Sequence, residues 1–120
     1  YSIHTKETFY KDMDTITSIL NKPILFIPHW NAKDKNGNLL ESRIKLNNWL
    51  KEYSIKNNHH FLNHENILNN YNYSSLFNKY SEMQFFEKER YGIYDINHLS
   101  EKGINLFSKS LEKYICNIKL

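Results

Sequence analysis

Pro23-Ile24-Leu25-Phe26-Ile27-Pro28 is the stretch that points most directly to a fold class. Its apolar residues follow one another without polar alternation, and a proline closes the run at each end. Such a run is typical of a strand that is buried on both faces of a parallel sheet. Pro28 ends the strand, because proline lacks the N–H that a sheet ladder requires. His29 and Trp30 then lie at the carboxyl end of the predicted strand.

Helical patterns flank this strand. Residues 5–20 and 41–56 each carry one apolar stripe at helical spacing, and Thr5 is placed as the N-cap of the first helix. Residues 59–63 predict a second, short strand. Strand, helix and strand in this order form the crossover unit of parallel sheets. The two stripes consist of Phe9, Met13, Ile16 and Leu20, and of Leu46, Trp49, Leu50 and Tyr53.

Two segments between these elements have little regular patterning. The polar residues 32–41 include Lys35-Asn36-Gly37-Asn38, which is a turn signal and predicts an exposed excursion. Residues 65–90 are rich in Asn, Tyr, Ser and Phe and predict loops with a short helix or two. Their aromatic residues either complete the core or line a cleft, and the pattern leaves both alternatives open.

The composition limits the classes of function. The 120 residues predict a single α/β domain over residues 1–120, with 40% hydrophobic residues and a net charge of +3. Lysines and arginines are mixed with acids along the chain, so no basic arm exists and no nucleic-acid partner is expected. No apolar run approaches the roughly 18 residues of a membrane span. The single Cys116 forms no internal disulfide, and the compartment stays open.

Asp95-Ile96-Asn97-His98-Leu99-Ser100-Glu101-Lys102-Gly103 is the stretch with the clearest chemistry. It places a carboxylate and an imidazole three residues apart, on a predicted loop that runs into a helix. Histidine can take and give a proton near neutral pH, and a neighbouring carboxylate can fix its tautomer. The pair is therefore a candidate for proton transfer, and the alternative is a loop acid and base that only cap the helix.

The last helix is predicted to begin after Ser100, whose side chain suits the N-cap position. Gly103 lacks a side chain at the start of this helix, which would let another backbone segment approach closely. An apolar stripe then predicts the buried face of the helix. That stripe consists of Ile104, Phe107, Leu111, Ile115 and Ile118.

The other histidines give weaker indications. His29 and Trp30 lie where open α/β sheets place their ligands, so they are candidate substrate-binding residues, although such a pair is often only packed together. His59, His60 and His64 carry no carboxylate or cysteine at a metal-ligand spacing. Neighbouring strand residues also point to opposite faces. We expect no metal site and no cofactor.

The segment Asp95-x-x-His98-Leu99-Ser100-x-x-Gly103, followed by an amphipathic helix, resembles the last block of the SGNH (GDSL-type) hydrolases. The preceding order of helix, strand ending in proline, helix and short strand is also similar to that family. The resemblance covers essentially the whole chain, but only as the C-terminal half of such a domain. It implies a flavodoxin-like, three-layer α/β/α fold with a parallel sheet, of which this chain is the C-terminal portion.

In that family His98 would be the general base of a serine esterase or acyltransferase, and Asp95 the acid that orients it. The family draws its serine from an N-terminal Gly-Asp-Ser block and its oxyanion-hole donors from two further blocks, none of which is present. Losing one such donor costs about 10²–10³ in rate, and losing the nucleophile about 10⁶. We therefore expect this chain alone to be inert.

Two functions follow as hypotheses. In the first, the chain is part of an SGNH-type hydrolase or acyltransferase, with an acylated carbohydrate or another acylated small molecule as its substrate class. The partner is then a missing N-terminal half or a second chain that carries the serine. In the second, the chain is a non-catalytic α/β module used for binding or assembly. Tyr1 in place of Met favours a processed chain or the later part of a longer one.

Overall fold

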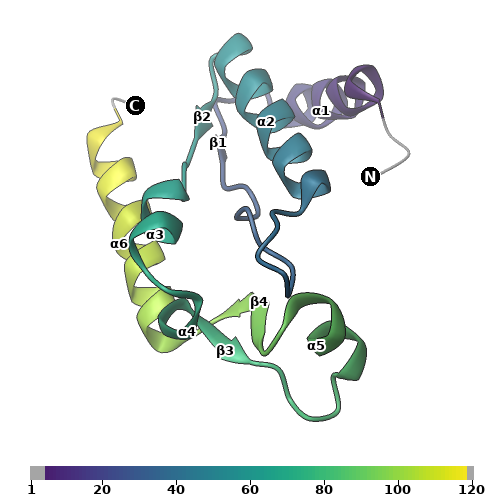
Figure 1. Cartoon of the computed structure of the whole chain (residues 1–120). Coiled ribbons are helices and arrows are strands. Elements are labelled where there is room, and N and C mark those ends of the chain that lie inside the picture. The colour runs from purple at the N-terminus through teal and green to yellow at the C-terminus, as the bar shows by residue number, and fades with distance from the viewer. Residues whose placement is uncertain (1–4, 119–120) are drawn as a thin grey trace. The chain divides into compact units, whose positions relative to one another are not determined.

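The protein is a mixed α/β structure, seen in a computed structural model that describes residues 5–118 (Figure 1). Of the described residues 57% are helical, and the strands form two small two-stranded sheets. Contacts divide the chain into two compact units, each treated separately below. Unit 1 comprises Tyr1–Asn31 and Glu41–Asn63, and unit 2 comprises Ala32–Leu40 and His64–Leu120. The single domain expected over the chain remains a prediction.

Unit 1 contains the crossover that the sequence predicts. Helix α1 (Lys6–Leu20) begins after Thr5, whose side chain accepts a hydrogen bond from the Thr8 N–H in a capping box. Strand β1 (Leu25–Phe26) leads through residues 27–40 to helix α2 (Glu41–Lys56), and strand β2 (His60–Phe61) follows. The strands are parallel, with Leu25 opposite His60. The two predicted helices and the strand, helix and strand order are confirmed.

The core of unit 1 lies between its two helices. Phe9 of α1 packs on Trp49 of α2 with ring centroids 5.7 Å apart. Tyr53, which is 1% exposed, donates a 2.8 Å hydrogen bond from its hydroxyl to Asp14. Because of this bond, the Tyr53 hydroxyl keeps a hydrogen-bond partner although its side chain is buried between the two helices. Burial, more than any neighbouring group, raises the pKa of the Tyr53 phenol.

The predicted burial of two segments in unit 1 is wrong. The first strand is not enclosed on both faces, because Leu25 and Phe26 are only partly buried and Ile27, which follows them, is 54% exposed. The stripe of α1 is covered by α2 at Phe9, whereas Ile16 and Leu20 at the other end of the helix are exposed. Apolar spacing therefore identified the helix but not the length over which it is covered.

Unit 2 begins with the polar excursion, whose turn is confirmed. Lys33 and Leu39 form an isolated antiparallel bridge around it. The Asp34 carboxylate accepts hydrogen bonds from the N–H groups of Asn36 and Asn38, at 2.9 and 3.0 Å. Gly37 adopts a φ of +80°, which a glycine reaches without strain. We call residues 33–39 the hairpin loop.

The remainder of unit 2 alternates short helices with an antiparallel strand pair. Helices α3 (Glu65–Asn70) and α4 (Tyr73–Leu76) precede strand β3 (Phe77–Lys79), and helix α5 (Phe85–Tyr91) precedes strand β4 (Tyr94–Leu99). Strands β3 and β4 pair antiparallel. The short helices agree with the expected loops and helices, but the antiparallel pair was not predicted. It does not belong to an all-parallel sheet.

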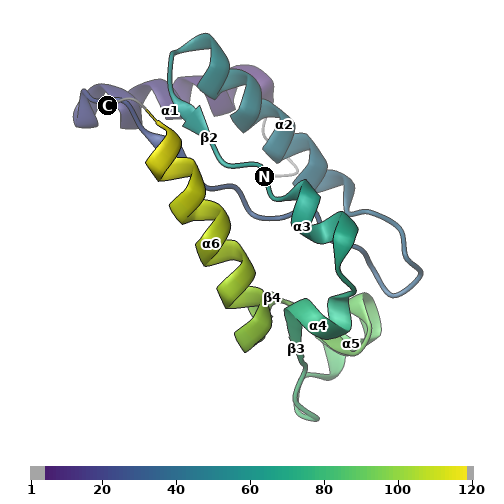
Figure 2. The same cartoon turned by 90° about the vertical axis from the view of Figure 1, so that its left-hand side faces the viewer.

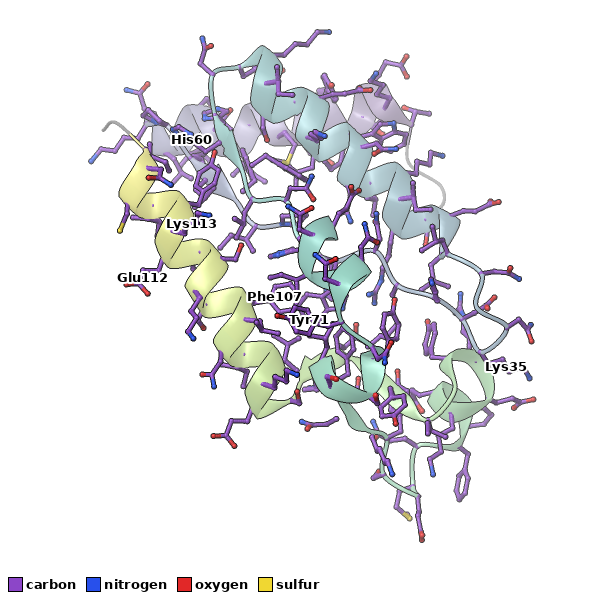
Figure 3. All side chains as sticks on the ribbon, turned by 60° about the vertical axis from the view of Figure 1, so that its left-hand side comes forward. Lys35, His60, Tyr71, Phe107, Glu112 and Lys113 are labelled. Carbon is purple, nitrogen blue, oxygen red and sulfur yellow. The ribbon has the colours of Figure 1, made fainter. Side chains whose placement is uncertain are left out.

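Helix α6 (Glu101–Asn117) starts beside α4 and β4 and extends away from them (Figure 2). Its Ser100 cap is confirmed by a 3.1 Å hydrogen bond that the hydroxyl accepts from the Gly103 N–H. Phe107 is buried and meets the ring of His64, at the start of α3, edge to face at 4.7 Å. Figure 3 shows Phe107 on the side of α6 toward α3 and Glu112 on the opposite side.

Burial along the α6 stripe is shorter than predicted. Phe107 is 7% exposed, but Ile104 and Ile115 are 52% and 48% exposed. Within unit 2, α4 and β4 contact α6, and the ring of Phe107 contacts His64 at the start of α3. No helix among residues 5–118 is long and apolar enough to cross a membrane.

Candidate functional site

The candidate acid and base lie in a strand, not in the loop that the sequence predicts. Both Asp95 and His98 belong to β4, and Ser100 follows at the junction with α6. In a regular strand, residues three apart point to opposite faces. Here the pairing with β3 shifts register, since Phe77 pairs with Leu99 while Lys79 pairs with Tyr94. Such an irregularity redirects side chains, and it allows the two to meet.

The two side chains form one hydrogen-bonded pair. His98 Nδ1 lies 2.7 Å from Asp95 Oδ2, and Asp95 Oδ1 accepts a 3.0 Å hydrogen bond from the Asn97 N–H. The carboxylate is thus held from both oxygens, and only 9% of its side chain is exposed, against 73% for His98. An ionised carboxylate can only accept, so Nδ1 carries the proton and Nε2 presents its lone pair. This is the tautomer that a general base needs.

Packing beneath the pair fixes the start of α6. The Ser100 hydroxyl donates to the Ser75 carbonyl at 2.5 Å, and the Ser100 N–H donates to the Leu76 carbonyl at 2.8 Å. A methyl group built on Gly103 would lie 2.2 Å from the Leu76 carbonyl oxygen. The predicted close approach of another backbone segment at Gly103 is therefore confirmed. The hydrogen bonds of Ser100 anchor this residue, which follows β4, to the end of α4.

Tyr80 is a neighbour of the pair that sequence reasoning missed. Its side chain is 5% exposed, and its N–H donates to the Ile93 carbonyl at 2.8 Å. Burial raises the pKa of the Tyr80 phenol, and the negative charge of Asp95 raises it further. The phenol thus stays neutral beside the carboxylate. No sequence signal marks Tyr80, because it comes to Asp95 only through the β3 and β4 pairing.

His29 and Trp30, the candidate substrate-binding residues, lie in unit 1 on the segment after β1. Their rings pack on each other with centroids 5.4 Å apart. Helix α2 holds this segment: Asn47 donates to the His29 carbonyl and Arg43 to the Trp30 carbonyl, at 2.5 and 3.5 Å. Loss of solvent around the ring, and then the Arg43 charge, lower the pKa of His29. The residue as a whole still contacts solvent, and the lowered pKa favours the neutral form of the ring.

His59 and His64 have structural surroundings. His59 Nδ1 accepts a 3.1 Å hydrogen bond from the Ile24 N–H, which joins the end of α2 to the segment before β1. His64 is buried against Phe107. A search of residues 5–118 finds no group of three His, Cys, Asp or Glu side chains that could hold a metal ion.

The described chain offers His98 no serine partner. Among residues 5–118 no serine hydroxyl makes a hydrogen bond to His98, and the nearest serine in sequence, Ser100, uses its hydroxyl on backbone groups of Ser75 and Gly103. What the arrangement can do is accept a proton at Nε2 from a group that reaches it from elsewhere. Ser100 is thus a structural residue of the site.

Comparison with known proteins finds no match among family models, curated proteins or solved structures.

Proposed function

We propose that the chain supplies the base and the orienting acid of an SGNH-type serine ester hydrolase or acyltransferase. The supporting observation is the 2.7 Å hydrogen bond between Asp95 and the inner nitrogen of His98, combined with the exposure of the imidazole. A carboxylate that merely capped α6 would not need a histidine on its second oxygen. In this proposal the serine and the oxyanion-hole donors come from outside residues 5–118.

The chemistry follows from the tautomer. As the serine oxygen attacks the acyl carbon, His98 Nε2 takes the hydroxyl proton, and it then gives this proton to the leaving alkoxide. Asp95 stabilises the imidazolium that forms between the two transfers, and it holds the ring so that Nε2 keeps facing outward. Hydrolysis and transfer differ only in whether water or another hydroxyl accepts the acyl group, and an acylated carbohydrate is one substrate class that the proposal includes.

The same proposal assigns the fold at a finer level. The parallel β1 and β2 pair with its α2 crossover is the unit from which a doubly wound sheet is built. A partner segment that adds strands beside this pair would give the flavodoxin-like, three-layer sheet of the family.

The test is turnover of p-nitrophenyl acetate by the complete protein, with its serine-bearing part present. His98→Ala removes the base and is expected to lower kcat by about 10⁴-fold or more, and Asp95→Asn is expected to lower it about 10⁴-fold by supporting the wrong tautomer. KM should change little, because neither side chain holds the acyl group.

Lys109→Ala, an exposed substitution on α6, is the matched control and should leave kcat unchanged. Equal turnover by the wild-type protein and the His98→Ala variant would refute the assignment of His98 as base. Circular dichroism of each variant distinguishes loss of chemistry from loss of fold, since His98 is exposed and its removal leaves the core intact.

A second candidate function is a non-catalytic binding or assembly module. The observation that favours it is the exposure of apolar residues on helices of both units, including Ile19 of α1 and Ile115 of α6. Large exposed apolar patches mark interaction sites. This function would be favoured if the chain associates stably in solution and no serine-bearing partner segment restores esterase activity.

A further inference from the structure

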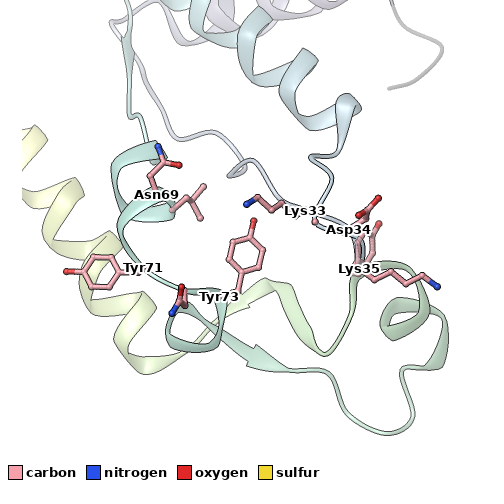
Figure 4. Close-up of a pocket in the computed structure, with 10 residues that line it drawn as sticks. Lys33, Asp34, Lys35, Asn69, Tyr71 and Tyr73 are labelled. Atoms are coloured by element: carbon pink, nitrogen blue, oxygen red, sulfur yellow. The ribbon is translucent and has the colours of Figure 1, made fainter.

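A cleft of about 440 Å³ lies within unit 2, and neither Asp95 nor His98 is among its lining residues (Figure 4). It is bounded by the hairpin loop on one side and by the segment that spans α3 and the start of α4 on the other. Its volume falls within the range of sites that bind small molecules, roughly 300–1,000 Å³. Its lining is dominated by lysine, asparagine and tyrosine side chains.

The charged groups of the lining are Lys33, Asp34 and Lys35. Figure 4 shows the Lys33 side chain directed into the cleft and the Lys35 side chain extending away from it. Lys33 and Lys35 are exposed, and neither makes an ion pair with another residue in the part of the chain that the structure describes. The carboxylate between them, that of Asp34, is directed to the backbone N–H groups of its own turn. Figure 4 shows the Lys33 side chain extending toward the hydroxyl end of Tyr73. An anion that enters here would meet the Lys33 ammonium group, whose charge is not already balanced by an ion pair among the described residues.

The opposite wall offers an aromatic ring and amides. Tyr73 is half-buried and is held by an edge-to-face contact with Phe77, with centroids 5.1 Å apart. Because this contact already fixes the Tyr73 ring, little side-chain entropy is lost when a ligand packs on the ring. Asn69 and Asn72 are exposed beside it and can each donate and accept hydrogen bonds. The hydroxyl groups of a sugar ring can donate hydrogen bonds to such amides and accept hydrogen bonds from them.

We propose that this cleft binds a negatively charged saccharide, namely a sugar ring that carries a carboxylate or a phosphate. The Lys33 ammonium group binds the anion, Tyr73 packs on a face of the ring, and the asparagine amides bind its hydroxyls. A nucleic-acid strand is a poorer fit, because neutralising successive phosphates requires more clustered cations than the one lysine directed into the cleft. The proposal does not depend on the reaction proposed for His98.

The experiment is a titration of the protein, at low salt, with glucuronic acid, glucose 6-phosphate, glucose and inorganic phosphate, followed by amide chemical shifts. Both charged sugars are expected to shift the Gly37, Asn72 and Tyr91 amides and to bind about tenfold more tightly than glucose. Tighter binding of glucuronic acid would identify an acidic polysaccharide as the source of the ligand, and tighter binding of glucose 6-phosphate a sugar phosphate.

Variants then separate the charge from the ring. Lys33→Ala should weaken binding of the charged sugars about fivefold, since an exposed ion pair contributes modestly, whereas Lys109→Ala on α6 should not weaken it. Tyr73→Phe keeps the ring and should retain binding. Equal affinity for glucose, equal affinity for inorganic phosphate, or unchanged affinity in Lys33→Ala would each overturn the proposal, as would shifts confined to residues outside the cleft. Because binding is measured, loss of esterase activity has no bearing on the result.

Discussion

The imidazole of His29 illustrates how a single residue couples folding to pH. Its pKa is lowered in the folded protein because the ring loses solvent and lies near the Arg43 charge. The unfolded chain, in which the pKa is near 6.5, therefore takes up the proton first as the pH falls. The stabilisation associated with the neutral ring is complete above about pH 6.5 and is lost as the pH falls through the lower, folded pKa.

We therefore predict that the free energy of unfolding of the His29→Gln variant depends less on pH below about pH 6.5 than that of the wild-type protein. Urea unfolding of the wild-type protein and of the variant, measured at several values between about pH 5 and 7.5, gives the difference that belongs to this side chain. The wild-type protein should lose more stability on acidification than the variant. Equal pH slopes for the two proteins would show that His29 does not titrate in the way its surroundings imply.

At the scale of elements, the junction of β4 and α6 depends on a residue without a side chain. A methyl group on Gly103 would overlap the Leu76 carbonyl oxygen, which also accepts the Ser100 N–H. Helix propensity favours Ala over Gly by about 1 kcal/mol, but here the steric cost should outweigh that gain. Gly103→Ala should therefore destabilise the protein by about 1–3 kcal/mol.

Chemical denaturation of Gly103→Ala and of Ser108→Ala measures this effect. Ser108 lies on the exposed side of the same helix, so its change to Ala should be neutral or slightly stabilising. Unaltered or raised stability in Gly103→Ala would mean that the α4 segment moves away at little cost, and that the contact does not hold the helix start.

The elements that could be predicted from sequence are those whose signals are local. The Thr5 and Ser100 caps and the helical stripes located α1, α2 and α6, because capping and periodicity act within a few residues. Strand β4 was missed, since its Asp, Asn and His residues are typical of loops. It is a strand because β3 supplies a partner, which is a contact that no local pattern encodes.

The same division holds for the candidate site. The spacing of three residues between Asp95 and His98 was sufficient to predict that their side chains could meet, because the chain that joins them is short. The carbonyl contacts of Asn47 and Arg43, and the approach of Tyr80 to Asp95, could not be predicted, since each joins residues that are distant in sequence. The role of His98 as a base remains a prediction.

At the scale of the whole molecule, large apolar side chains are exposed in both units. Ile19 and Leu20 are exposed in unit 1, at 77% and 53%. In unit 2, Met83 and Phe86 are exposed at 83% and 84%, beside the exposed stripe of α6. Exposed apolar side chains favour association in water. The helical faces are consistent with a partner segment that covers them.

We predict that the chain of residues 1–120 associates in solution as its concentration rises. Light scattering should show a mass above that of a 14.5 kDa monomer at micromolar concentration. Replacing Ile104 and Ile115 together by Lys should reduce this mass, because both side chains are about half exposed on α6 and contribute apolar surface without filling a core. A monodisperse wild-type monomer would contradict both the partner segment and the assembly module.

The irregular pairing of β4 has a consequence for how such a site could arise. Most acid and base pairs join residues from distant parts of a chain, so their formation carries the entropy of closing a long loop. Here both members lie within four consecutive residues, and a turn between Asp95 and the Asn97 N–H already sets their separation. The geometry of the Asp95 and His98 pair is therefore set within one short segment of chain, and a serine from another chain needs only to reach Nε2 of His98.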